Sequence, residues 1–202
     1  MHPKINTIIF DCFGVICDPV INGWYKEHRL KKGFVDDNFK KMLIQSDLGK
    51  LSENDIFEYI MKYEDINFSK EELRNEIDSY LTLDTKLADI IKKLKSKGYK
   101  TVLLSNSNST FFERKVYSTY PEFKNLFDEI IISASIGMVK PNKEIYMHTL
   151  DKINSKPEES LFIDDSKENV DGAIDVGING YLYTDSDSFV EYIENIGIDL
   201  SK

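Results

Sequence analysis

Four short polar clusters in this 202-residue chain each follow an apolar run. The clusters are Asp11, directly after Ile8-Ile9-Phe10, then Ser105-Asn106-Ser107, Lys140-Pro141 and Asp164-Asp165-Ser166. Such short apolar runs are typical of buried strands in a parallel sheet. Because ligands bind beyond the carboxyl ends of these strands, we expect the four clusters to converge on one edge of one sheet and to form a site there.

Strand and helix patterns alternate over most of the chain. Strands are predicted at residues 5–10, 99–104, 129–132, 161–163 and 181–183, and helices at residues 87–94, 109–120, 142–153, 167–176 and 189–196. This order is typical of βαβ units. It predicts an α/β fold with a doubly wound, Rossmann-like parallel sheet.

Residues 18–82 interrupt the alternation with helical patterns alone. Within them, Ser52 with Asp55 and Ser69 with Glu72 have the three-residue spacing of helix N-terminal capping pairs. We expect an all-helical insert of roughly four helices. The predicted domains are an α/β catalytic core, residues 1–17 and 83–202, and a helical cap, residues 18–82, that lies over the strand ends as a lid.

Composition excludes several classes of protein. The formal net charge of −9 argues against a nucleic-acid partner, because nucleic acids are bound through clustered Lys and Arg. No run approaches the ~20 apolar residues of a membrane span, and the N-terminus lacks the apolar stretch of a signal peptide. Cys12 and Cys17 lack the accompanying histidines of a zinc site and are expected to be small buried thiols. We expect a cytoplasmic protein, a monomer or a weak dimer, that binds neither nucleic acid nor membrane.

The residue types in the four clusters favour phosphate chemistry. Taken alone, each cluster is also typical of a helix cap or a turn. Together they offer carboxylate oxygens, which Mg²⁺ prefers as ligands, a lysine point charge for phosphoryl oxygens, and donors from Ser105 and backbone N–H groups at a strand-to-helix turn. Asp11 is the candidate nucleophile, since carboxylates form aspartyl-phosphate intermediates.

As a set, the clusters resemble the sequence motifs of the haloacid dehalogenase superfamily, in the branch with a helical cap after the first motif. The matching segments are Asp11-Cys12-Phe13-Gly14-Val15, Val102-Leu103-Leu104-Ser105-Asn106, Gly137-Met138-Val139-Lys140-Pro141 and Phe162-Ile163-Asp164-Asp165 with the later Asn169. The resemblance spans nearly the whole chain except the insert. It implies a hydrolase that binds a small phosphorylated metabolite and Mg²⁺.

The resemblance also implies a role for each position. The implied magnesium ligands are Asp11, the backbone carbonyl of Phe13, Asp165, and Asp164 directly or through water. Ser105 and Asn106 would bind the phosphate, with Phe13 beside the substrate. Lys140 would neutralise both the phosphate and the nucleophile Asp11, and Asn169 and Gly172 would support the loop.

Phe13 departs from the pattern of most phosphatases in this superfamily, which have an aspartate there as general acid and base. Loss of such a group costs about 10²–10⁴ in rate where the leaving group needs a proton. The favoured interpretation is a magnesium-dependent phosphatase that obtains its acid from the cap, a water or a substrate hydroxyl, or that prefers activated substrates. Two alternatives stay open: a metal-free dehalogenase in which Asp11 attacks carbon, and a catalytically weak binding or regulatory relative. Within the cap, the candidates for substrate contacts are Trp24, Tyr25, His28, Arg29 and the Asp47-Leu48-Gly49-Lys50 turn. Trp24 and Tyr25 are equally expected in the core of the cap, and His28 and Arg29 on its surface.

Overall fold

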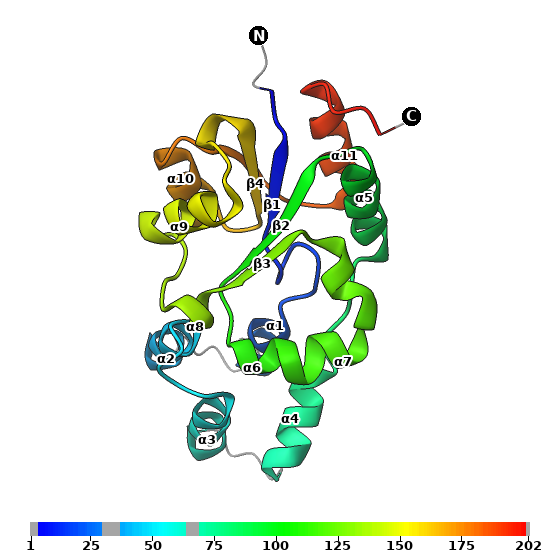
Figure 1. Cartoon of the computed structure of the whole chain (residues 1–202). Helices are drawn as coiled ribbons and strands as arrows, with labels where there is room; N and C mark the ends of the chain where they lie inside the picture. The colour runs from blue at the N-terminus through cyan, green and yellow to red at the C-terminus, as the bar shows by residue number, and fades with distance from the viewer. Residues whose placement is uncertain (1–3, 30–36, 64–68, 201–202) are drawn as a thin grey trace.

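The computed structural model describes residues 4–29, 37–63 and 69–200 (Figure 1). The strands are β1 (Thr7–Phe10), β2 (Lys100–Ser105), β3 (Glu129–Ile132), β4 (Ser160–Asp164) and β5 (Asn179–Leu182). The helices are α1 (Val20–Arg29), α2 (Asp37–Asp47), α3 (Glu53–Tyr63), α4 (Lys70–Asp78), α5 (Thr85–Ser96), α6 (Ser109–Phe111), α7 (Tyr117–Thr119), α8 (Ser133–Ile136), α9 (Lys143–Ile153), α10 (Lys167–Asp175) and α11 (Ser186–Asn195). The structure also contains one π-helical turn, η2 (Phe112–Val116), and two 3-10 turns, η3 (Pro121–Leu126) and η4 (Pro157–Glu159). In these ranges no helix combines the length and the apolar character needed to cross a bilayer.

The five strands form one parallel sheet in the order β3-β2-β1-β4-β5, which confirms the predicted doubly wound α/β fold. β1 is the central strand, and Phe10 at its carboxyl end is in register with Leu103 of β2 and Ile163 of β4. Asp11 therefore emerges between the ends of the two neighbouring strands. This register places the first, second and fourth polar clusters at the same edge.

Alternate side chains of β1 pack on opposite faces of the sheet, as the period of two in a strand requires. Ile8 and Phe10 belong to the larger apolar core, where Phe10 contacts Phe189 of α11 edge-on at 5.9 Å between ring centroids. Ile9 belongs to the other core, with Tyr146 of α9. Figure 1 shows α9 and α10 on one side of the sheet and α5 and α11 on the other. β1 is buried on both faces, so its position is strongly determined.

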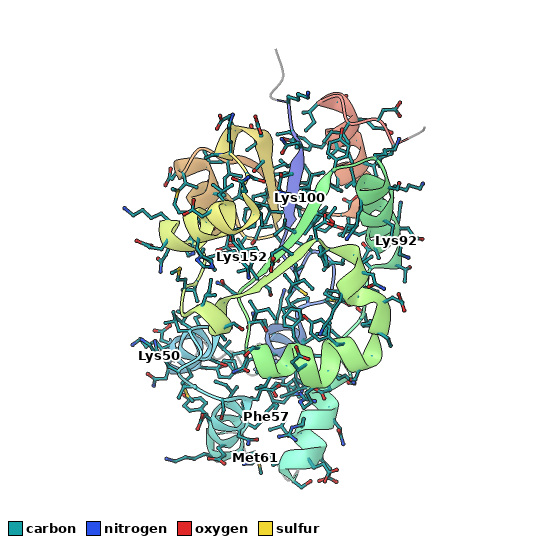
Figure 2. The ribbon with its side chains drawn as sticks, in the orientation of Figure 1. Lys50, Phe57, Met61, Lys92, Lys100 and Lys152 are labelled. Carbon is teal, nitrogen blue, oxygen red and sulfur yellow. The ribbon has the colours of Figure 1, made fainter. Side chains whose placement is uncertain are left out.

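Helices α1 to α4 lie between β1 and β2 in sequence and beyond the carboxyl ends of the strands in space (Figure 1). The starts of α3 and α4 follow the predicted capping pairs: Ser52 N–H donates to Asp55 Oδ2 at 2.7 Å, and Ser69 with Glu72 forms a complete capping box. Trp24 is only 1% exposed, so it is a core residue of the insert. In Figure 2, Phe57 lies on α3 among these inserted helices.

Helix α5 has one solvated and one buried face. Figure 2 shows Lys92 pointing outward from α5, whereas Ile91 and Leu94 on the same helix are fully buried. Lys92 pairs with Asp89, one turn earlier on the helix, at 2.9 Å. The helix is therefore amphipathic, with a charged face toward water.

The structure differs from the expectation at residues 109–120, where a single α-helix was predicted. The segment is divided into α6, the π-helical turn η2 and α7. In this arrangement Phe112 and Val116 are fully buried, while Arg114 faces the inserted helices and donates to Glu53 at 3.0 Å and to Asp78 at 2.5 Å. A hydrophobic period alone cannot distinguish a π turn from an α turn, and such turns are frequent near functional sites.

Candidate active site

The loop after β1 places the buried carboxylate of Asp11 at the sheet edge. Asp11 N–H still donates to Ile163 O at 2.9 Å, and Cys12 O then accepts from the N–H groups of Ile16 and Cys17 at 2.9 and 2.8 Å, which turns the chain. Gly14 has a φ of +100°, a conformation that favours glycine. A Cβ at Gly14 would overlap the Asp165 carboxylate, so its absence lets Asp165 approach the loop.

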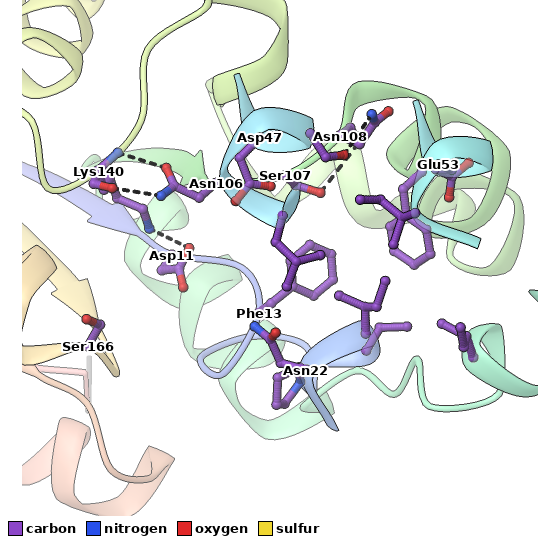
Figure 3. A pocket seen from close by; sticks show the side chains of 18 of the residues that line it. Asp11, Phe13, Asn22, Asp47, Glu53, Asn106, Ser107, Asn108, Lys140 and Ser166 are labelled. Atoms are coloured by element: carbon purple, nitrogen blue, oxygen red, sulfur yellow. Dashed lines mark hydrogen bonds and ion pairs between the residues drawn. The ribbon is translucent and has the colours of Figure 1, made fainter. Parts of the chain in front are cut away.

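Lys140 joins the first and last clusters through one buried ammonium. Its Nζ lies 2.6 Å from Asp11 Oδ1 and 2.6 Å from Asp164 Oδ2, and the three side chains are 1%, 9% and 0% exposed. The side chain of Asn106 holds the backbone of Lys140 in place, because its Oδ1 accepts from Lys140 N–H and its Nδ2 donates to Lys140 O, both at 2.9 Å (Figure 3). All four clusters predicted to converge are thus in mutual contact or adjacent at this edge.

Burial governs the protonation of these groups. It raises the pKa of Asp11 to about 7, although the neighbouring Lys140 ammonium opposes the shift. Burial by itself lowers the pKa of Lys140, but Asp11 and Asp164 outweigh it, and the net pKa is raised. Lys140 therefore stays charged, and the anionic form of Asp11 depends on it.

Asp11, Asp164 and Asp165 each present a carboxylate oxygen within 4.8 Å of the others. Asp164 already accepts from Lys140, from Ser166 N–H at 2.8 Å and from Asn169 Nδ2 at 3.0 Å. Three carboxylates face one ammonium here, and the surplus negative charge is what a divalent cation neutralises. The donor set, oxygen only, suits Mg²⁺.

The second cluster presents buried polar atoms beside this carboxylate group. Ser105 is fully buried and its Oγ has no hydrogen-bond partner in the described structure, which is costly unless a ligand or water satisfies it. Ser107 and Asn108 line the adjacent cavity. Asn108 Nδ2 donates to Leu51 O at 3.1 Å and so connects this loop to the insert. Sequence analysis did not predict Asn108 as a site residue, and its helix-capping pattern was the one signal that pointed to this position.

A cavity of about 500 Å³ lies between the sheet edge and the inserted helices (Figure 3). Its apolar wall is formed by Phe13, Val20, Ile21, Leu43, Ile56, Phe57, Ile77 and Phe111. The Phe13 ring packs on Phe111 and Phe112, with centroids 5.8 and 5.7 Å apart. Among the described residues, the polar ones on the wall include Asp11, Lys140 and Asp165, together with Asp47 at the end of α2.

The profile of the haloacid dehalogenase-like hydrolase family matches residues 5–177, most of the chain. The protein belongs to this family. The predicted family is thereby confirmed, and the match spans all four clusters.

Three relatives illustrate the similarity. The chain is 35% identical over 103 residues to the sesquiterpene phosphatase astK of Aspergillus oryzae, covering 51% of this chain and 52% of that one. It is 25% identical over 214 residues to bifunctional epoxide hydrolase 2 of Sus scrofa, covering 95% of this chain and 39% of that one. The fold superposes with a TM-score of 0.73, at 22% identity, on the HAD family enzyme bt-2542 of Bacteroides thetaiotaomicron in complex with magnesium and inorganic phosphate, covering 92% and 98% of the two chains. The chain thus spans about half, or less, of the two curated relatives.

Within this hydrolase the structure separates the predicted site residues into two groups. Asp11, Asn106, Lys140 and Asp165 line the cavity. Ser105 and Asp164 lie behind that surface, fully buried. Sequence reasoning placed Asn106 on the phosphate, whereas its side chain is paired with the backbone of Lys140. The predicted support role of Gly172 agrees with its packing, since a Cβ there would lie 2.6 Å from Pro141 O.

Proposed function

We propose that this hydrolase is a magnesium-dependent phosphatase that acts on a small phosphorylated metabolite through an aspartyl-phosphate at Asp11. The observation that carries the proposal is the group of three carboxylates, Asp11, Asp164 and Asp165, around the single ammonium of Lys140. Such a group accommodates a divalent cation and the dianion of a phosphate together. The relatives named phosphatase, and the magnesium and phosphate in the bt-2542 complex, support it.

In the proposed reaction, a carboxylate oxygen of Asp11 attacks phosphorus and the bond to the leaving oxygen breaks. Water then attacks the phosphorus of the aspartyl-phosphate, which releases inorganic phosphate and restores Asp11. Mg²⁺, when bound by Asp11, Asp165 and the Phe13 carbonyl, neutralises charge on the phosphoryl oxygens. Lys140 orients the nucleophile and lowers the repulsion between the two anions.

Within this proposal, Asp164 is a positioning residue that contacts the metal through water. Its oxygens already accept from three donors, Lys140, Ser166 and Asn169. Ser105 Oγ, which has no partner among the described residues, is assigned to the phosphate together with the backbone N–H of Asn106. The side-chain amide of Asn106 acts indirectly, by fixing Lys140.

We assign residues 18–82 as a cap that excludes water during phosphoryl transfer. The cavity walls contributed by α1, α2, α3 and α4 support this assignment. The apolar residues on those walls favour a phosphate ester with an apolar leaving group. They are Val20, Ile21, Leu43, Ile56, Phe57 and Ile77, and they lie beside the polar Asn22, Ser46, Asp47, Glu53 and Asp78. The 35% identity to a sesquiterpene phosphatase agrees with this choice.

The second candidate is a dehalogenase in which Asp11 attacks carbon. The Phe13 ring favours it, because departure of a halide needs no proton. Asp164 and Asp165 oppose it, because two further carboxylates without a cation would repel an anionic substrate. A catalytically weak binding relative is the third candidate.

The test is phosphate release from 4-nitrophenyl phosphate, isoprenoid phosphates and sugar phosphates, each with Mg²⁺ and with EDTA. The proposal predicts release that requires Mg²⁺ and is abolished in Asp11→Asn, with the fold of the variant intact as judged by a cooperative melt. Halide release from 2-haloacids in EDTA, without phosphate release in Mg²⁺, would establish the second candidate instead. If a cooperatively melting protein releases neither phosphate nor halide, the third candidate, a catalytically weak binding protein, is supported.

A further inference from the structure

We propose that Asp47, at the end of inserted helix α2, is the general acid and base that replaces the aspartate missing at Phe13. This inference rests on the proposed phosphatase function. Asp47 lines the same cavity as Asp11, Phe13 and Lys140, and Figure 3 shows its side chain among the labelled residues of that wall. The group is thus supplied by a different element, 34 positions further along the sequence than Phe13.

The backbone at Asp47 is fixed on the core. Ser133 Oγ donates to Asp47 O at 2.6 Å, which anchors the end of α2 beside the carboxyl end of β3. Gly49, with a φ of +72°, packs so closely on α8 that a Cβ would lie 2.5 Å from Ala134 O. The turn that follows α2 is therefore seated against α8, which fixes the backbone of Asp47 beside the cavity that Asp11 and Lys140 also line.

The environment of Asp47 suits proton transfer near neutral pH. Burial raises its pKa to about 7, with Lys140 opposing the shift. The other titratable groups on this wall, within the described ranges, are Asp11, Glu53, Asp78, Lys140 and Asp165.

Most of those groups are engaged elsewhere. Glu53 and Asp78 are both paired with Arg114, at 3.0 and 2.5 Å, and Asp11 is paired with Lys140. Asp47 forms no ion pair with any residue that the structure describes. A general acid needs a pKa near the working pH and a place in the cavity that holds the substrate, and the burial and position of Asp47 suit both requirements.

The proton balance closes over the two steps. As Asp11 attacks phosphorus and the P–O bond to the leaving group breaks, protonated Asp47 gives its proton to the leaving oxygen, which departs as an alcohol. The Asp47 carboxylate then takes a proton from the water that attacks the aspartyl-phosphate. The P–O bond to Asp11 breaks, inorganic phosphate leaves, and Asp47 is protonated again.

The test compares two phosphate esters whose leaving groups differ in their need for a proton. We would measure kcat/KM of the wild type and Asp47→Asn with Mg²⁺ on 2-phenylethyl phosphate, whose alkoxide needs a proton, and on 4-nitrophenyl phosphate, whose phenolate does not. Asp47→Asn is expected to lose about 10²–10⁴-fold on the alkyl ester and only a few-fold on the aryl ester. Asp37→Asn is the matched control, because Asp37 begins the same helix and is exposed. It is expected to be unchanged on both esters.

The wild-type pH profile gives a second readout that requires no variant. kcat/KM for the alkyl ester is expected to fall above pH ~7, as Asp47 loses its proton, while that for the aryl ester does not fall there. Equal losses on both esters in Asp47→Asn, or none, would overturn the role of Asp47. So would a wild type that hydrolyses only the aryl ester, although the phosphatase function would then stand. A wild type that hydrolyses neither ester would contradict the phosphatase proposal itself.

Discussion

Replacement of Lys140 by methionine should strongly destabilise the fold. Lys140 Nζ donates to Asp11 and Asp164 at 2.6 Å each, and both carboxylates are nearly or fully buried. Lys140→Met keeps most of the side-chain volume but leaves two buried carboxylates without their shared cation. Removal of one partner from a buried ion pair costs ~3–5 kcal/mol. With an m-value of ~2–3 kcal/mol/M, the urea midpoint should fall by about 1–2 M.

The assay is urea unfolding followed by circular dichroism, in EDTA and in Mg²⁺. The loss should be smaller in Mg²⁺, because a bound cation neutralises part of the same charge. Lys152→Met is the matched control: Lys152 pairs with Glu129 at 3.1 Å on the surface, with both side chains partly exposed. Such an exposed pair contributes only ~0–1 kcal/mol. Equal stability of Lys140→Met and Lys152→Met in EDTA would refute the reasoning.

Three further substitutions test the metal site and one helix cap. Asp165→Asn should weaken Mg²⁺ binding in calorimetry at an almost unchanged melting temperature, because Asp165 is exposed; unaltered affinity would remove it from the metal site. Gly14→Ala should also weaken Mg²⁺ binding, since its Cβ displaces the Asp165 carboxylate, and it should lower the melting temperature because of the positive φ. Burial raises the pKa of Asp84, but hydrogen bonds from Leu87 N–H and Ser186 Oγ outweigh it and hold the pKa below its usual value. This stabilisation is present above pH ~4 and is lost as pH falls through the lower folded-state pKa. Asp84→Ala should therefore cost ~1 kcal/mol at pH 7 in urea unfolding and almost nothing at pH 2, and a penalty independent of pH would contradict this assignment.

Much of the fold follows from local patterns in the sequence. The runs ending at Phe10, Ser105 and Asp164 are buried strands because a parallel sheet covered on both faces accepts continuous apolar side chains. The capping pair of Ser69 and Glu72 marks the start of α4 because it satisfies backbone N–H groups that lack helical partners. The meeting of Asp11 and Asp164 follows from parallel topology, which places strand ends together. Lys140, expected at a strand end, instead lies in the loop after α8 and reaches both carboxylates from there.

Other features depend on tertiary packing and leave no local signal. The pairing of Asn106 with the backbone of Lys140 requires the exact path of a loop 34 positions away. The approach of Asp47 to the site depends on how α2 docks on Ser133, across the interface between insert and sheet. A sequence shows that Phe13 cannot transfer a proton, but only the packed structure shows which distant carboxylate shares its cavity.

The central claim is that Asp11 carries the phosphoryl group, and the most direct test is to find it there. Turnover of 4-nitrophenyl phosphate with Mg²⁺ would be stopped in acid within one catalytic cycle, and the peptides analysed by mass spectrometry. We expect a phosphoryl group on the peptide that contains Asp11, lost in EDTA and in Asp11→Asn. Steady phosphate release with no phosphoryl group on that peptide, together with full activity of Asp11→Asn, would contradict the mechanism.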